Sequence, residues 1–421
     1  MSDQKVAVEK LWSEIERRES ELIELVSDLV RYPSVLGNEA GVQHFIAEHF
    51  RASDLETDVW DIDESVKDLP DAGDSQVPFE GRPNVTGKYS GAGGGRSLII
   101  NGHVDVVSPE PVDAWSYDPW GAQIVGNRMY GRGALDMKSG VALNMMLPRL
   151  LRDAGIKTKG DITLHSVIEE ECTGNGALAA SKRDTADAAV ITEPTRGTIS
   201  QAHVGVMWFK IRVQGRSAHA AVAPTGVNAV SKMVPIIRAL EQLDDELNAS
   251  KHPLFAEFDH PINLNIGVMQ SGDWPSTVPG AAELHCRVSM FPGTTVDEMR
   301  SEIEQAVLHA SQTDEWLQEH KPEITYYGFG SKGSEISLDD PPFKMLGQWH
   351  EAVQGSPVQP RVGTGINDMR YYNFAGVPAT CYGAAGEGAH AADEWLDVNS
   401  LVPTAKVLGA FILDWCGVAD A

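Results

Sequence analysis

The spacing of apolar residues near the start of the chain predicts two helices followed by two strands. Apolar side chains recur every three or four positions across residues 6–31, and Pro33 ends this pattern. One long helix with a single buried stripe is therefore expected, and a second helix is expected at 39–50. Short apolar runs predict strands at 57–62 and 84–89.

Strands and helices alternate through the next part of the chain. The pattern predicts strands at 97–107, 161–168 and 188–192, with helices at 138–153 and 175–182 between them. This alternation is typical of an α/β fold whose mixed, mostly parallel sheet carries helices on both faces, with sites at the carboxyl ends of the strands. Because proline interrupts helical hydrogen bonding, Pro148 is expected to kink its helix or end it early.

The pattern changes near residue 201 and changes back near residue 334. Between these points we expect strands at 204–213, 262–269, 281–290 and 323–328 and helices at 226–247 and 296–311. The order βαββαβ is typical of a small α+β layer. Helices at 342–354 and 398–415 and a strand at 379–382 are expected to follow. The predicted organisation is one discontinuous domain, 1–200 and 334–421, with a second domain, 201–333, inserted into it.

Composition narrows the class of protein. The 421 residues are 42% hydrophobic, which is ample for two or three domains with their own cores. The net charge of −26 argues against nucleic acid or an anionic membrane as a partner. The four cysteines are widely spaced, so free thiols are expected rather than a disulfide framework or a thiolate zinc site. Without an apolar signal core or a long apolar run, a cytoplasmic location is expected.

Residues that bind metals gather at the predicted strand ends. His103 and Asp105 end the strand at 97–107 and, two positions apart, face the same side. Asp136 follows in the glycine-rich turn 131–140. Later strand ends and a C-terminal loop add Glu169, Glu170, Glu171, Glu193 and His390. A lone His-Asp pair is more often structural, but this set of histidines and carboxylates indicates a metal site.

With these motifs the chain resembles the dinuclear zinc amidohydrolase and metallopeptidase family, which includes acetylornithine deacetylase, succinyl-diaminopimelate desuccinylase, aminoacylase and the carboxypeptidase G type enzymes. The resemblance runs from about residue 20 to the end. It includes His-x-Asp, Gly-Arg-Gly-x-x-Asp-Met-Lys, Glu-Glu, Glu-Pro and the late histidine. It implies a zinc-exopeptidase-like catalytic domain, with residues 201–333 as a ferredoxin-like lid and dimerisation domain.

The resemblance also implies a ligand set for two divalent metal ions, Zn²⁺ foremost and Co²⁺ or Mn²⁺ as alternatives. Asp136 would bridge both ions. His103 and Glu193 would complete one site, and Glu171 and His390 the other. Asp105 would hold the other ring nitrogen of His103. The peptide bond after Asp136 is expected to be cis.

Glu170 is the acid that this ligand set leaves over. An acid beside a metal site that does not coordinate the ions can take a proton from the activated water and pass it to the leaving amine. The run of three glutamates can also be explained as a charged strand end or helix start. Matching Gly174 to the family's glycine makes Glu170 the base and Glu171 the ligand, and a slip of one residue would move both roles.

The resemblance assigns further residues to catalysis and substrate binding. His219 would stabilise the oxyanion, and Arg287 would contact a substrate carboxylate, although a surface charge explains this arginine as well. The glycine-rich loop would bind substrate through Gly363, Thr364 and Gly365. Asp368 and Arg370 at its end are interpreted as a structural ion pair. Relatives commonly carry Asn where Ser276 stands, and nearby Trp274 adds an aromatic surface of open role.

The leading hypothesis is a metal-dependent amidohydrolase that removes the acyl group of a small N-acylated amino acid or related amine, as acetylornithine deacetylase does. A dipeptidase, a carboxypeptidase or a deformylase of an aromatic amine remains an alternative with the same chemistry. A non-catalytic ligand-binding or scaffold protein is the alternative from another class. The resemblance further implies a homodimer formed through the lid, in which His219 completes the active site of the partner subunit.

Overall fold

A six-stranded sheet forms the centre of the larger part of the molecule. The computed structural model describes residues 3–420. In sheet order the strands are β1 (Glu56–Trp60), β2 (Asn84–Tyr89), β6 (Ile162–Val167), β3 (Leu98–His103), β7 (Ala189–Ile191) and β15 (Ala379–Cys381). The last four run parallel, whereas β1 and β2 are antiparallel to their neighbours. The parallel strands are apolar and almost wholly buried because both faces of the sheet are covered.

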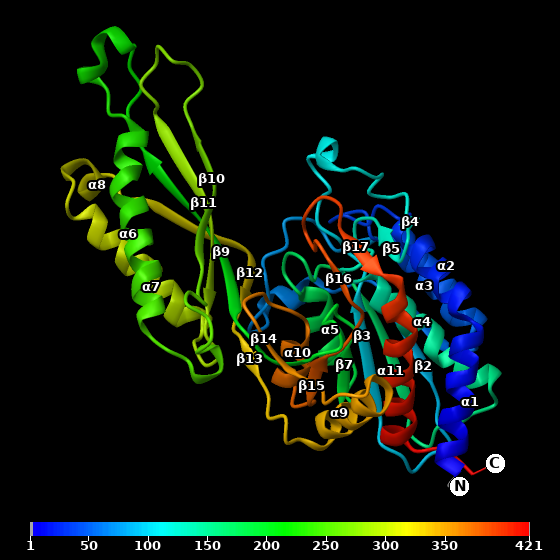
Figure 1. Cartoon of the computed structure of the whole chain (residues 1–421). Helices are drawn as coiled ribbons and strands as arrows, with labels where there is room; N and C mark the ends of the chain where they lie inside the picture. Colours follow the sequence, from blue (N-terminus) through cyan, green and yellow to red (C-terminus); the bar gives the residue numbers. More distant parts are fainter. Residues whose placement is uncertain (1–2, 421) are drawn as a thin grey trace.

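Helices lie on both faces of this sheet, as Figure 1 shows. On one side lie α4 (Lys138–Asp153) and α11 (Leu401–Cys416), and on the other lie α5 (Asn175–Arg183) and α10 (Met369–Phe374). The helices α3 (Ala40–Ala52) and α9 (Pro341–Gln354) complete this part. The predicted α/β class with a mixed, mostly parallel sheet is therefore confirmed.

The single N-terminal helix expected from the sequence is wrong. The chain forms α1 (Asp3–Arg17) and α2 (Glu19–Val30), which meet at Arg18, where the backbone leaves the helical region with φ −111° and ψ 20°. The helix α1 packs against α11, whereas α2 packs against α4. Arg18 pairs with Asp153 at 2.8 Å between Nη2 and Oδ2. The apolar spacing continues through the break, so it could not show that the two halves have different partners.

Pro148 does not end its helix early, and the helix has the predicted bounds, 138–153. The helix α4 continues to Asp153, and all but a few of its side chains are buried. Burial of leucines beyond the proline, including Leu150 and Leu151, stabilises the last turn despite the missing hydrogen bond.

Two small sheets were not predicted. One has the order β16 (Gly386–Glu387), β17 (Trp395–Asp397), β5 (Arg128–Tyr130) and β4 (Gln123–Val125). The other joins β13 (Ser334–Glu335), β8 (Ile199–His203) and β14 (Pro360–Gly363). These strands are two to five residues long, too short for the alternation of apolar and polar residues to indicate them.

Residues 205–331, here called the inserted segment, form a separate antiparallel sheet with two long helices on one face (Figure 1). Its elements are β9 (Gly205–Gln214), α6 (Ala229–Ala249), β10 (Leu264–Ser271), β11 (Ala281–Met290), α7 (Val296–Ser311), α8 (Glu315–Glu319) and β12 (Glu323–Ser331). The sheet order is β10-β11-β9-β12, and the predicted βαββαβ order is confirmed with α8 added. Its apolar side chains form a core of their own.

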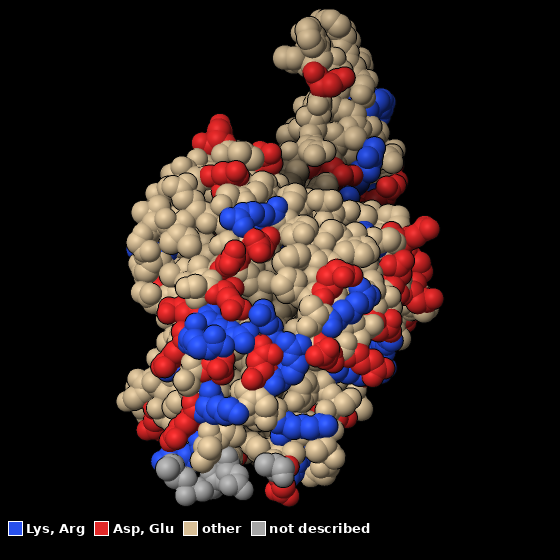
Figure 2. All heavy atoms as spheres, turned by 90° about the vertical axis from the view of Figure 1, so that its right-hand side faces the viewer, with Lys and Arg blue, Asp and Glu red and all other residues tan. Residues whose placement is uncertain are grey.

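Charges of both signs are interspersed on one face of the molecule. Figure 2 shows the face that carries α1, α2 and α4, where basic side chains lie among acidic ones. The pairs include Arg149 with Glu21 and Arg152 with Asp54. Across residues 3–420, no helix combines the length and apolar character that a membrane span requires. All four cysteines are unpaired, as expected.

Removing a large side chain from the inserted segment's core should destabilise the protein. Phe209 on β9 is completely buried, so Phe209→Ala should lower the free energy of unfolding by about 3–5 kcal/mol through lost burial and a cavity. Leu308→Ala on α7 is the matched control, because Leu308 is 50% exposed. Urea unfolding of both variants checks this, and equal losses would show that the segment lacks a packed core of this kind.

Candidate active site

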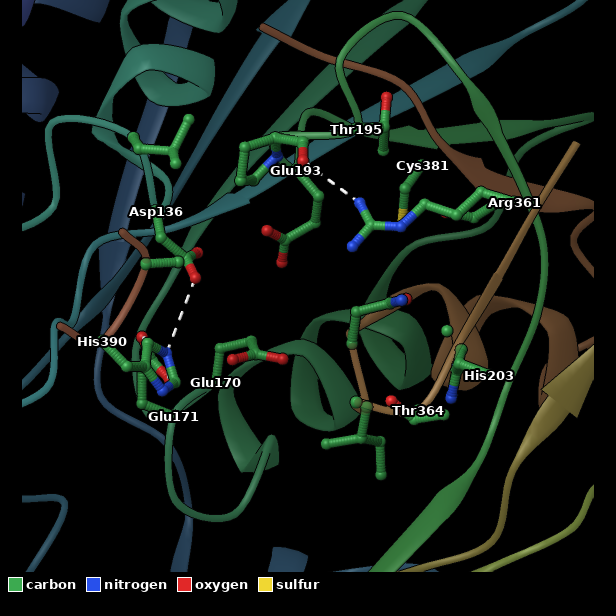
Figure 3. Close-up of a pocket in the computed structure, with 18 of the residues that line it drawn as sticks. Asp136, Glu170, Glu171, Glu193, Thr195, His203, Arg361, Thr364, Cys381 and His390 are labelled. Atoms are coloured by element: carbon green, nitrogen blue, oxygen red, sulfur yellow. Dashed lines mark hydrogen bonds and ion pairs between the residues drawn. The ribbon is translucent and has the colours of Figure 1, made fainter. Parts of the chain in front are cut away.

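The metal-binding residues come together at the carboxyl edge of the parallel strands (Figure 3). His103 is the last residue of β3, the three glutamates follow β6, and Glu193 follows β7. Asp136 lies just before α4, and His390 lies in the loop between β16 and β17. Parallel strands end at one edge of a sheet, so residues distant in sequence meet there.

Asp136 lies between the two histidines. Its Oδ1 is 3.3 Å from His103 Nε2, and its Oδ2 is 3.6 Å from His390 Nε2. Glu193 approaches His103, with 3.6 Å between Oε1 and Nε2. Glu171 approaches His390, with 3.0 Å between Oε2 and Nε2. Two groups of one histidine and one glutamate therefore share a single aspartate, which is the arrangement that the resemblance implies for two metal ions.

The three consecutive glutamates have different surroundings. Glu169 is fully buried and faces away from the cluster, where its carboxylate accepts hydrogen bonds from Ser75, Arg82 and Thr173 at 2.6–2.7 Å. Its φ of +66° turns the chain before the next residue. Glu170 does face the cluster, with Oε2 at 4.0 Å from His103 Nε2. Of the three consecutive glutamates, Glu170 and Glu171 therefore lie in the cluster and Glu169 does not.

Burial concentrates negative charge in this cluster. Burial raises the pKa of Glu170 and of Glu193 well above the usual range, and neighbouring carboxylates add to the rise for Glu193. Burial lowers the pKa of His103, but Asp136 and the surrounding carboxylates outweigh it and raise that pKa well above its usual value. Asp136 and Glu171 raise the pKa of His390 to about 11. The raised pKa values of these four groups all indicate that the site requires positive charge.

The residues fit a divalent metal pair. His103 Nε2 and Glu170 Oε1 are buried and have no hydrogen-bond partner. Ligand atoms of His103, Asp136 and Glu171 lie within 4.8 Å of one another, and so do those of His103, Glu170 and Glu193. Imidazole and carboxylate ligands suit zinc and the neighbouring divalent metals. Metal ions bound here would satisfy the unpartnered atoms and offset the charge of the surrounding carboxylates.

Asp105 organises this site differently from the expectation. The nearest acceptor to His103 Nδ1 is the backbone carbonyl of Asp105, at 3.0 Å, whereas the carboxylate lies 3.7 Å away. The Asp105 carboxylate instead accepts the backbone N–H groups of Glu170 and Glu171, at 3.1 and 3.0 Å. It therefore connects the strand that carries His103 to the loop that carries both glutamates. The Asp136–Met137 peptide is cis, which confirms that expectation.

Glu394 is a residue that sequence reasoning missed. Its buried carboxylate accepts the backbone N–H groups of Gly133, Leu135 and Asp136 at 3.0–3.1 Å and pairs with Arg132 Nη1 at 2.6 Å. Arg132 also donates to the Ala391 carbonyl, next to His390. This pair connects the loop that carries Asp136 to the loop that carries His390. The signal available in the sequence was the position of this acid, four residues after His390.

A cavity of about 1030 Å³ opens beside the cluster. Arg287, Gly363, Thr364 and Gly365 line it, as the resemblance implies for substrate-binding residues. Arg287 lies on β11 of the inserted segment and donates to the Thr364 carbonyl at 3.3 Å. The cavity is therefore bounded by both parts of the molecule.

The predicted ion pair between Asp368 and Arg370 is wrong. The salt bridges among the described residues do not include this pair, and both side chains are fully buried. Arg370 donates to the Asn367 carbonyl at 2.6 Å and to Ser331 Oγ at 3.2 Å. Asp368 accepts from Asn101 at 3.2 Å. Neighbouring positions in sequence thus point to different partners.

His219 is not brought to the cluster within one chain. It lies in the connection between β9 and α6 of the inserted segment, is exposed, and accepts the Ala221 N–H at 3.0 Å. It does not line the cavity. Ser276 lies nearby, since its carbonyl accepts the Ala220 N–H, and Trp274 is 68% exposed. In a single chain these residues are therefore remote from the metal-binding groups.

The sequence resembles known hydrolases over most of its length. The family described as Peptidase family M20/M25/M40 matches residues 99–414. An N-formyl-4-amino-5-aminomethyl-2-methylpyrimidine deformylase of Bacillus subtilis is 29% identical, over 96% of this chain and 97% of that protein. An acetylornithine deacetylase of Klebsiella pneumoniae is 28% identical, over 77% and 81%. Among solved structures, human carnosine dipeptidase 1 shares the fold, with a TM-score of 0.76 at 15% identity over 97% of this chain and 99% of that one.

Loss of the Glu394 carboxylate should weaken the site. Glu394→Ala would leave Arg132 and three backbone N–H groups without their acceptor, so metal affinity should fall by about 10–100-fold. Glu351→Ala on the exposed side of α9 is the control. Metal titration of the folded variants measures the effect. Unchanged affinity in Glu394→Ala would contradict the positioning role.

Proposed function

Because the chain belongs to peptidase family M20/M25/M40, whose enzymes are hydrolases that depend on two metal ions, we propose that this enzyme removes the acyl group of a small N-acylated amine. One observation carries the proposal: Glu170 faces the cluster beside two complete ligand groups, with a buried carboxylate oxygen that has no partner. A binding protein has no use for such an acid, whereas amide hydrolysis needs a group that accepts and returns a proton.

The residues have distinct parts in this reaction. His103, Glu193 and Asp136 would hold one ion, and His390, Glu171 and Asp136 the other, with zinc proposed and cobalt or manganese as alternatives. When bound, the ions lower the pKa of a water molecule and polarise the amide carbonyl. Glu170 would take a proton from the attacking water as the water oxygen bonds to the amide carbonyl carbon. The protonated acid then delivers the proton to the amine nitrogen as the C–N bond breaks.

The amine released by the reaction has two main candidates, an amino acid and an aminomethyl-pyrimidine. An N-acylated amino acid is favoured by Arg287 and the glycine-rich loop in the cavity and by the acetylornithine deacetylase relatives. A formylated aminomethyl-pyrimidine is favoured by relatives that align with nearly the whole chain, 96% and 98% of it. Both reactions use the same ligand groups and the same base. Dipeptides are a third option, since a dipeptide is also an N-acylated amino acid.

We further propose a homodimer in which His219 completes the site of the partner subunit, and a cytoplasmic location. The strand β10 is the edge strand of the inserted sheet. Two of its residues, Val268 and Met269, are 41% and 47% exposed. An exposed edge strand with apolar side chains can pair with the same strand of a second copy across a two-fold axis. Such pairing would give the exposed His219 a neighbouring cavity to enter.

The two glutamates of the cluster should respond differently to substitution. Glu170→Gln should keep about two metal ions per chain and lower kcat by orders of magnitude, because only the proton acceptor is lost. Glu171→Gln should lower the metal content, because a ligand is lost. Metal analysis and hydrolysis of N-acetyl and N-formyl substrates measure both effects. Metal loss in the Glu170 variant alone would reverse the two roles.

Mixing two inactive variants tests the role of His219. His219→Ala and Glu170→Ala are each expected to be inactive. If His219 acts on the partner subunit, a mixed dimer contains one site with both groups intact, and activity should return to roughly a quarter of the wild-type value. The measurement is hydrolysis after subunit exchange, with each variant alone as the control. Persistent inactivity after exchange has been demonstrated would place His219 in its own subunit's site or outside catalysis.

A further inference from the structure

His203 is a buried histidine that the proposed reaction does not use. It is the last residue of β8, is 1% exposed, and pairs with Gly363 on β14. It lines the same cavity as the metal-binding groups. Figure 3 shows His203 and Thr364 across the cavity from His390 and Glu171, with Glu170 and Glu193 between the two sides. It therefore lies where the part of a substrate remote from the metal site would rest.

The hydrogen bonding of His203 fixes where its proton lies. Its Nδ1 is 2.8 Å from the Val204 carbonyl oxygen. A carbonyl oxygen can only accept, so Nδ1 carries the hydrogen and Nε2 of the neutral ring has a free lone pair. Burial lowers the pKa of His203 to about 3, and the charge of Arg370 contributes to this. The ring is therefore neutral, and Nε2 is an acceptor.

This acceptor has no partner among residues 3–420. His203 Nε2 is buried, and the described residues offer it no hydrogen bond. His165, another buried histidine, differs because both of its nitrogens have partners, Tyr372 at 2.8 Å and Asp184 at 3.2 Å. An unsatisfied buried acceptor is costly. Because His203 is one of the residues that line the cavity, its unpaired Nε2 indicates a hydrogen bond made to a ligand.

Part of the wall of this cavity is aromatic. Trp208 and Phe329 both line it, and their rings pack edge to face with centroids 5.3 Å apart. Flat apolar groups pack well against such rings. A carboxylate would instead bring its own lone pairs toward Nε2, which repels it. The chemistry here suits a ring that carries an N–H donor.

We propose that His203 is a specificity-determining residue, whose Nε2 accepts a hydrogen bond from an amino group on an aromatic ring of the substrate's amine half. The inference rests on the proposed deacylase function and goes beyond it by choosing between the candidate amines. An amino-substituted heteroaromatic amine satisfies the acceptor and the aromatic wall, whereas an amino acid carboxylate satisfies neither. Arg287 and the glycine-rich loop then contact other acceptor atoms of the substrate.

A matched pair of substrates tests the proposal. The probes are N-formyl-aminomethylpyrimidines with and without a ring amino group, assayed with the metal-loaded full-length enzyme. Wild type should prefer the amino compound by about tenfold or more in kcat/KM, because its absence leaves Nε2 unpaired. His203→Leu should remove this preference by slowing the amino compound alone. His203→Gln, which offers an amide oxygen, should restore part of it.

The compound without the amino group is the internal control for folding and metal loading. Its kcat/KM in His203→Leu should be at least the wild-type value, because the variant leaves no acceptor unpaired. A preference that survives in His203→Leu overturns the proposal, and so does a wild type without any preference. A ¹⁵N spectrum of histidine-labelled enzyme gives a reading independent of turnover. It should show His203 protonated at Nδ1 and unprotonated at Nε2, and a protonated Nε2 would also overturn the proposal.

Failure of this inference can be told apart from failure of the proposed function. Hydrolysis of N-acetyl amino acids without hydrolysis of either pyrimidine overturns the role of His203 and leaves the deacylase intact. Inactivity toward every acyl compound, with metal bound, overturns the deacylase. In that case the affinities of the enzyme for the two free aminomethylpyrimidines test the role of His203. Tighter binding of the amino compound to wild type but not to His203→Leu supports the acceptor role, and equal binding overturns it.

Discussion

The structure depends on holding several carboxylates close together where water is largely excluded. Asp136, Glu170, Glu171 and Glu193 all face one small volume at the edge of the sheet. Such charges repel each other and lose solvation on burial, so the arrangement is unfavourable unless cations are bound and the backbone is held firmly. The raised pKa values of Glu170 and Glu193 record this cost. A bound metal pair would supply the positive charge, and the fold supplies the rigidity.

Rigidity comes from a second set of buried charges around the site. Arg82 lies between Glu39 and Glu169 and fixes the residue before Glu170, with 2.5 Å from Nη2 to Glu39 and 2.7 Å from Nη1 to Glu169. Arg132 and Glu394 hold the loops of Asp136 and His390 in the same way. Arg82 and Arg132 donate to backbone carbonyls, and Glu394 accepts backbone N–H groups, so these pairs hold backbone groups in place. The ligands can then stay close together before any ion is bound.

The substrate side of the cavity is built from other elements than the cluster of carboxylates. Its groups come from β8, β11, β12 and the loop after β14, which are far apart in the chain. Two of its polar groups have a defined direction: Arg287 donates to the Thr364 carbonyl, and His203 Nε2 has no hydrogen-bond partner among the described residues.

The sequence by itself determined the sheet class, most of the long elements and the residues of the metal cluster. These features are local: apolar spacing encodes strands and helices, and strand ends in a parallel sheet necessarily meet. Only the tertiary structure decided which glutamate turned away to Arg82, that α1 and α2 separate at Arg18, and that Glu394 holds the Asp136 loop. It also decided that Nε2 of His203 is left without a partner while His165 is satisfied. Each of these outcomes depends on which groups from distant segments come within hydrogen-bonding distance, and spacing along a chain carries no information about that.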